Sequence, residues 1–225
     1  EGNTDGFAYA GLQATRQRGL GGAVRMWNTL VEGAVGAKYV PLDPRDFSSN
    51  PSGAPGWPIG YPDLLPFYVR AQEACGLGPF RYDAEAWQST DAAPFDLAQT
   101  SLTSRVYQFG RASRWLEDHL VAISHADNVR LLSRTTAGHF LPAGTSRPRR
   151  LQVKDTVTGA DATVRSDVFI LAGGAVENAR LLMLSGIGSQ PARGGWLGRC
   201  FMEHPRDGSL RLVPLDPDVI DRAAF

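Results

Sequence analysis

The stretch VFILAGGAVENARLLMLS, residues 168–185, decides the fold class. Its apolar run, Val168–Ala172, is typical of a strand that is covered on both faces. After the glycine pair the apolar residues recur at helical spacing, which predicts a helix over Val176–Ser185 that ends at Gly186. A strand that passes through glycines into a helix predicts an α/β protein, and ligands of open α/β sheets bind beyond the carboxyl ends of the strands.

The glycine pair Gly173-Gly174 has two interpretations on local pattern alone. Without a Cβ it lets a ligand approach the backbone closely, and it serves equally as a tight turn with no ligand. Glu177 falls in the first turn of the predicted helix, where a carboxylate favours the helix itself and would repel a phosphate. A ligand at this turn is therefore expected to present a ribose or an adenine edge.

A second glycine run, Gly19–Gly22, lies near the start of the chain. The N–H groups of such a run can bind a pyrophosphate. Trp27 and Asn28 follow it and are suited to stack on, and hydrogen-bond to, a flat ring system. A glycine turn without a ligand explains the run as well, and the motif alone favours that simpler interpretation.

The composition restricts the class of protein. The chain has 225 residues, 43% of them hydrophobic and 20% charged, which predicts a globular protein with a core. Its 23 basic and 23 acidic residues cancel, which argues against a nucleic-acid or membrane-surface protein, since both need a positive field. Cys75 and Cys200 form neither a disulfide framework nor a zinc motif, so a reducing, cytoplasmic setting is expected.

Between the two glycine motifs the sequence predicts a loop and two helices. The Pro-rich stretch 41–62 is predicted to be an ordered loop pinned by its aromatic residues. A helix is expected over Asp63–Cys75, capped by Asp63 and ended by Gly76. A second helix is expected over about 104–124, on apolar spacing.

After Asn128 the apolar period shortens. Residues 129–132 and 137–141 are predicted to be short strands, and 150–157 with 163–165 a hairpin. The four histidines lack metal-ligand spacing, and no metal site is predicted. The chain does not begin with Met and shows no signal-peptide pattern, so an excerpt of a longer protein is one interpretation.

Four sequence segments, taken in their order along the chain, indicate a known family. They are GLGG with MWN within residues 19–28, GWPIGYPDLLPFY at 56–68, AGGAVENARLL at 172–182 and LGRCFMEHP at 197–205. In this order the chain resembles the glucose–methanol–choline (GMC) oxidoreductases, a family of FAD-dependent alcohol and sugar oxidases and dehydrogenases. The spacing after the second glycine pair is similar to that of the pyranose oxidase and C-glycoside oxidase branch.

The resemblance implies an α/β (mixed α+β) fold, in which part of an FAD-binding Rossmann-like domain is interleaved with part of an antiparallel-sheet substrate domain. It divides the chain into 1–40 (FAD-binding part), 41–100 (Pro-rich loop and substrate-domain helix), 101–200 (FAD-binding part) and 201–225 (start of the substrate-domain sheet).

The resemblance also implies a set of FAD contacts. Along the cofactor would run Gly21, Gly22 and Ala23. Near the flavin ring would lie Met26, Trp27, Asn28 and Thr29. Backbone atoms of Ala137 would contact the adenine, and Ala172 and Gly173 would lie close to the adenosine. Members with covalent flavin carry a histidine where Met26 stands, so FAD is expected to be noncovalent. No residue of this chain is assigned a catalytic role.

The implied activity is hydride transfer from the carbon of a small-molecule alcohol or sugar to the flavin, while a base takes the hydroxyl proton. The candidate partner is a second chain that supplies the missing N- and C-terminal parts. The alternative is a noncatalytic partner or remnant domain that keeps the fold. A nicotinamide dehydrogenase is less favoured, because no GxGxxG follows a strand. The flavoprotein interpretation requires Gly21 and Gly173 to converge on one nucleotide.

Overall fold

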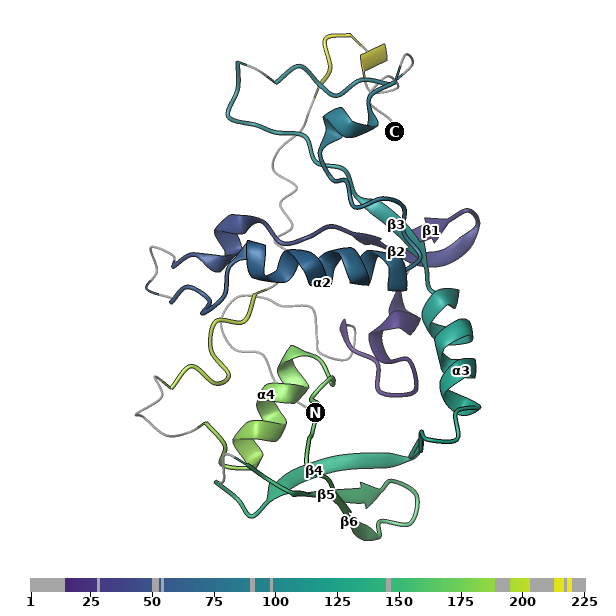
Figure 1. Ribbon diagram of the computed structural model, residues 1–225, viewed down its shortest axis with the longest axis vertical. Coiled ribbons are helices and arrows are strands. Elements are labelled where there is room, and N and C mark those ends of the chain that lie inside the picture. Colours follow the sequence, from purple (N-terminus) through teal and green to yellow (C-terminus); the bar gives the residue numbers. More distant parts are fainter. Residues whose placement is uncertain are drawn as a thin grey trace. The chain divides into compact units, whose positions relative to one another are not determined.

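The computed structural model describes residues 15–27, 29–49, 53, 55–89, 92–97, 99–144, 147–188, 195–202, 213–216 and 218–219. The chain divides into two compact units, the first formed by residues 1–130 with 209–225 and the second by residues 131–208. The described residues of each unit include a three-stranded antiparallel sheet and helical segments (Figure 1). The predicted mixed α/β class is confirmed, while the predicted division into FAD-binding and substrate parts stays a prediction.

The sheet of the first unit has the order β1-β2-β3, formed by Thr29–Val31, Ala34–Tyr39 and Gln108–Arg111. Glu32 and Gly33 join β1 to β2, and both have positive φ, 49° and 77°. A two-residue turn of this kind matches the twist of paired strands. The turn therefore holds the segment after the first glycine run in a hairpin.

The helix predicted over 104–124 is wrong in its first half, because β3 occupies residues 108–111. Exposure alternates along β3, with Gln108 and Gly110 buried. Gly110 packs so closely that an added Cβ would lie 3.0 Å from side-chain atoms of Leu77 and Tyr39. Pairing with β2 therefore overrides the apolar spacing. The helical path begins only with η4, a π-helical segment over Arg114–His119, and continues as α3, Leu120–Ser124.

The helix predicted over Asp63–Cys75 is confirmed as α2, Tyr61–Ala74, but its N-cap residue is Gly60, and Asp63 lies inside the first turn. The Asp63 carboxylate accepts the Gly60 N–H at 2.8 Å, and so closes the first turn. At the other end Gly76 has φ +66°, and the Leu77 N–H donates to the Gln72 carbonyl at 3.0 Å. This is the left-handed glycine cap that the sequence predicted.

A buried polar network joins α2 to β3. Gln72 and Gln108 are 6% and 7% exposed, and the Gln72 amide donates to the Gln108 side-chain oxygen at 2.8 Å. The Tyr82 hydroxyl donates to Gln72 at 2.7 Å. Gln108 also donates to the carbonyls of Pro79 and Arg81 at 2.7 and 3.0 Å. Because buried polar groups are costly unless paired, this network fixes the loop at 78–82 against the helix.

The Pro-rich stretch is an ordered loop in its described part, as predicted. It contains η2, Pro44–Phe47, a 3-10 turn capped by Asp43. The Trp57 N–H donates to the Phe47 carbonyl at 2.9 Å, and the two rings lie 5.9 Å apart. The Phe47 side chain, 7% exposed, thus anchors the loop. A further 3-10 turn, η3, spans Ala84–Trp87.

The second unit contains the predicted hairpin. Its sheet has the order β4-β5-β6, formed by Thr135–Leu141, Arg150–Asp155 and Asp161–Arg165, and α4, Ala175–Leu184, lies along β4 (Figure 1). Phe140 is 2% exposed, and its N–H donates to the buried Ser185 hydroxyl at 2.9 Å. The helix predicted over 176–185 is confirmed, and Gly186 follows it with φ +64°.

Two strand predictions are wrong, one at the boundary between the units and one in the second unit. Residues 129–132 form no strand, and Val168–Ala172 pair with no described segment of the chain. Val168 and Ile170 are 72% and 88% exposed, while the Phe169 ring packs on Phe140 at 5.0 Å. Only one side of this apolar run is therefore covered by the described residues.

Candidate functional site

The first glycine run forms a tight turn that leads into η1, a 3-10 turn over Gly22–Met26. The Gly22 N–H donates to the Gly19 carbonyl at 3.0 Å. Gly21 caps the turn with φ 83°, and an added Cβ would lie 2.4 Å from the Leu116 Cδ2. Gly21 therefore has to be glycine for two reasons, the left-handed backbone and the packing of Leu116.

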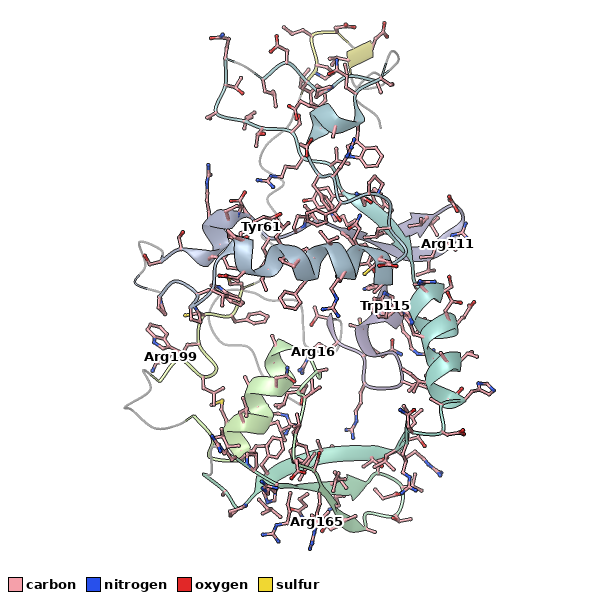
Figure 2. The ribbon with its side chains drawn as sticks, in the orientation of Figure 1. Arg16, Tyr61, Arg111, Trp115, Arg165 and Arg199 are labelled. Carbon is pink, nitrogen blue, oxygen red and sulfur yellow. The ribbon has the colours of Figure 1, made fainter. Side chains whose placement is uncertain are left out.

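The residues after this turn pack on an aromatic pair. The Trp27 ring meets the Tyr39 ring edge-on, with centroids 6.0 Å apart. The Trp115 indole N–H donates to the Tyr39 hydroxyl at 3.3 Å, with Trp115 in the helical segment that follows β3 (Figure 2). Burial raises the pKa of the Tyr39 phenol, and the hydrogen bond from Trp115 offsets part of that rise. Trp27 is thus held in place by protein contacts.

Of the predicted residues near Trp27, Ala23 and Met26 lie within η1 and Thr29 opens β1 opposite Gly36. Ala23 is exposed, while Met26 and Thr29 are half-buried. Asn28 lies outside the described residues. The structure thus gives Ala23, rather than its neighbours, the most open surface in this group.

The second glycine turn is held by Asn178. Its side-chain oxygen accepts the Gly173 N–H at 2.9 Å, and its amide donates to the Leu171 carbonyl at 3.0 Å. Gly174 caps α4 with φ 88° and ψ 159°, and nothing lies within 4 Å of an added Cβ. Residues Ala172 to Gly174 are exposed, and the hydrogen bonds of Asn178 fix the conformation of their backbone.

Glu177 lies in the first turn of α4, as predicted. Its carboxylate accepts a hydrogen bond from the Arg180 Nε at 2.7 Å. The ion pair offsets part of the negative charge that would act on a ligand at this helix N-terminus. The expectation of a ribose or adenine edge here stays a prediction.

Ala137 lies in β4 beside an irregularity of the ladder. It pairs with Val153, whereas His139 pairs with Gln152, so Gly138 has no cross-strand partner. A β-bulge of this kind interrupts the ladder and leaves backbone groups out of the strand pairing. The residue left out of the pairing is Gly138, next to Ala137, and the adenine contact of Ala137 stays a prediction.

The predicted site residues fall into two groups, and each group lies within one unit. Gly21–Thr29 belong to the first unit, and Ala137 with Ala172–Gly173 to the second. Their convergence on one nucleotide stays a prediction. Sequence reasoning missed Leu116, whose approach to Gly21 has no sequence signal. It also missed the clamp by Asn178, although an Asn in a first helical turn commonly bonds to nearby backbone.

A mixed α/β chain with an exposed glycine turn at the start of a helix is compatible with the class of proteins that hold a nucleotide cofactor by backbone contacts. Residues 67–206, more than half of the chain, match the family model of the GMC oxidoreductases. The chain belongs to the GMC oxidoreductase family. Searches of curated proteins and of solved structures returned no match.

The matched part is the N-terminal domain of this family, which binds FAD, so FAD is the cofactor. The structure fits such a ligand at the second glycine turn, where the backbone is exposed and the space beside Gly174 is open. At the first turn there is less room for the ligand, since Leu116 already fills the space beside Gly21.

Among the described residues, no three His, Cys, Asp or Glu side chains are grouped closely enough to hold a metal ion. Within the same residues, no helix combines the length and the apolar character that crossing a bilayer requires.

Proposed function

We propose that the chain is a segment or subunit of a GMC oxidoreductase that oxidises a hydroxyl group of a sugar, glycoside or other alcohol. The observation that carries the proposal is the family match over residues 67–206. The sequence AGGAVENARLL at 172–182 supports the finer assignment to the pyranose oxidase and C-glycoside oxidase branch, because its spacing is similar to that branch.

The proposal divides the cofactor contacts between the two glycine turns. Ala137, Ala172 and Gly173 contact the adenosine, supported by the β-bulge at Gly138 and the exposed backbone at the second turn. Residues 21–29 contact the pyrophosphate and the flavin. The exposed position of Ala23 supports this assignment, since the space beside Gly21 is taken by Leu116.

FAD, when bound, supplies the acceptor for a hydride. The chain positions this acceptor by noncovalent contacts alone, because the Met26 thioether cannot form a histidyl link. The proposal assigns the base that takes the hydroxyl proton to no residue of 1–225. A second chain, or a continuation of this one, supplies that base, and residues 1–225 alone are expected to show no turnover.

Cofactor binding is tested with a bulkier side chain at the proposed adenosine contact. Ala172→Leu is expected to weaken FAD binding at least about tenfold, because the new side chain covers the exposed backbone. Ala122→Leu adds the same bulk to an exposed position of α3 and should leave binding unchanged. Titration followed by flavin fluorescence measures both. Equal FAD affinity of the two variants would contradict the assignment.

The mode of attachment is tested by acid precipitation of the FAD-loaded chain. All flavin is expected in the supernatant, and flavin that stays with the protein pellet would overturn the noncovalent assignment. A folded chain that binds no FAD would favour the alternative, a noncatalytic domain.

The substrate class is tested by anaerobic flavin reduction in the chain together with its partner segments. Sugars and glycosides are expected to bleach the flavin, and the chain alone should not be bleached. Reduction only by substrates without a hydroxyl group would contradict the proposed chemistry. A cytoplasmic setting is also part of the proposal, supported by the free thiols of Cys75 and Cys200.

A further inference from the structure

A cavity of about 320 Å³ opens within the first unit, beside the first turn of α2. Its walls come from the end of the Pro-rich loop, from α2 and from the two segments joined by the bridge between Asp83 and Arg105. Tyr61, which lines the cavity, stands at the start of α2 (Figure 2). The cavity includes none of the residues that the resemblance assigns to FAD.

Aromatic rings form one side of the cavity and hold each other in place. Tyr61 and Tyr68 lie 5.9 Å apart at an angle of 31°, and Tyr68 and Phe80 are stacked at 6.3 Å and 21°. Phe80 meets Tyr82 edge-on at 5.3 Å. Three of these rings, Tyr61, Phe80 and Tyr82, line the cavity. Such rings carry negative charge on their faces, which attracts cations.

Two carboxylates, those of Asp83 and Glu85, also line the cavity. Asp83 precedes η3 without capping it through its side chain, and Glu85 lies in the first turn of η3. Within the described part of the chain, neither carboxylate forms an ion pair. The cation in the lining, Arg105, is bound by Asp43 at 2.6 Å. With two carboxylates and one guanidinium, the lining therefore carries an excess of negative charge.

We propose that this cavity binds a compact organic cation, an alkylated ammonium group, between the rings of Tyr61, Phe80 and Tyr82 and the carboxylates of Asp83 and Glu85. Aromatic rings and carboxylates both attract a positively charged ligand. A neutral ligand of equal size gains only apolar contact, and an anion is repelled. This inference stands independently of the FAD assignment and of the proposed substrate.

The test compares two probes of similar size on the full chain. Tetramethylammonium carries the charge, and tert-butanol does not. Tetramethylammonium is expected to shift the backbone amide NMR signals of residues 80–85 and 103–105 at least about fivefold more than tert-butanol does. Its affinity is expected to fall as sodium chloride is raised, because salt screens the partly exposed carboxylates. Equal shifts from both probes would overturn the proposal, as would shifts confined to other residues.

Charge removal supplies the matched comparison. The double variant Asp83→Asn, Glu85→Gln keeps the shape of the wall and is expected to weaken tetramethylammonium binding about tenfold. The control Glu73→Gln, Glu117→Gln removes the same charge from exposed positions outside the cavity and should change the affinity less than about twofold. Equal effects of the two double variants would show that net charge alone acts, and would overturn the site.

Discussion

The two glycine turns look alike in sequence and differ in what their glycines do. Gly21 and Gly174 each cap a helical segment with φ near 85°, at 83° and 88°. The space beside Gly21 is filled by Leu116, whereas the space beside Gly174 is open. The first turn therefore needs glycine for packing within the protein. The second needs it for the backbone conformation and leaves its outer side accessible to a ligand.

The turns also differ in what supports them. The first is closed by backbone hydrogen bonds of its own run, such as that from Gly22 to Gly19. The second is held by one side chain, Asn178, which bonds to the backbone on both sides of Ala172. A glycine motif thus indicates a special backbone, and only the neighbours tell whether that backbone serves packing or a ligand.

The largest expected effect is that of Gly21→Ala. The left-handed backbone and the contact with Leu116 together are expected to lower the free energy of unfolding by about 2–4 kcal/mol. Gly19→Ala is the matched control, since nothing lies within 4 Å of its added Cβ. Urea unfolding followed by tryptophan fluorescence compares the two, and Leu116→Ala in the Gly21→Ala background should recover part of the loss. If both single variants lost the same free energy of unfolding, the contact between residue 21 and Leu116 would not contribute to the effect.

At the second turn the corresponding test is Asn178→Ala. It leaves the Gly173 N–H and the Leu171 carbonyl without their partner and is expected to cost about 1–3 kcal/mol. Asn178→Asp keeps the acceptor for Gly173 and adds a charge that the helix N-terminus favours, so its loss should be smaller. Hydrogen exchange of the Gly173 amide gives a direct readout, with fast exchange in the Ala variant. Unchanged exchange there would mean that Asn178 does not hold the turn.

Gly174→Ala is expected to have a smaller effect than Gly21→Ala. Its φ and ψ of 88° and 159° fall in a region that only glycine adopts readily, so about 1–2 kcal/mol of strain is expected. With open space around the new methyl group, no clash adds to this strain. Urea unfolding checks the order of the two variants. A loss that equals or exceeds that of Gly21→Ala would erase the difference between the turns.

Local signals predicted much of the structure. The cap at Gly76, the end of α4 at Gly186 and the hairpin of β5 and β6 follow from turn chemistry that neighbouring residues settle among themselves. The aromatic anchoring of the Pro-rich loop is of the same kind, because Phe47 and Trp57 are close in sequence.

Predictions that depend on distant partners fared worse. Residues 108–111 have a spacing that suits a helix, yet they pair with β2, about seventy residues earlier. Val168–Ala172 have the composition of a covered strand, but composition does not supply a ladder partner. For the candidate site, the sequence located both glycine turns. It gave no sign of Leu116, because that contact joins residues about a hundred positions apart.

The smallest expected effect concerns the cysteines, one in each unit. Cys75 caps the end of α2 and is half-buried, while Cys200 is exposed. Burial raises the pKa of the Cys75 thiol, and a hydrogen bond with Tyr39 offsets part of that rise. At neutral pH the thiolate, which is the reactive form, is therefore a smaller fraction of Cys75 than it would be without burial. The half-buried Cys75 sulfur is also less accessible to a reagent than that of Cys200.

Iodoacetamide is expected to modify Cys200 at least about tenfold faster than Cys75 at neutral pH, measured by peptide mass spectrometry. The rate at Cys75 should keep rising with pH until the pH passes the raised pKa of its thiol, because the thiolate fraction grows over that range. In the urea-unfolded chain the two rates should converge, since burial is lost. Equal rates in the folded chain would show that the first unit shields its thiol no better than the second.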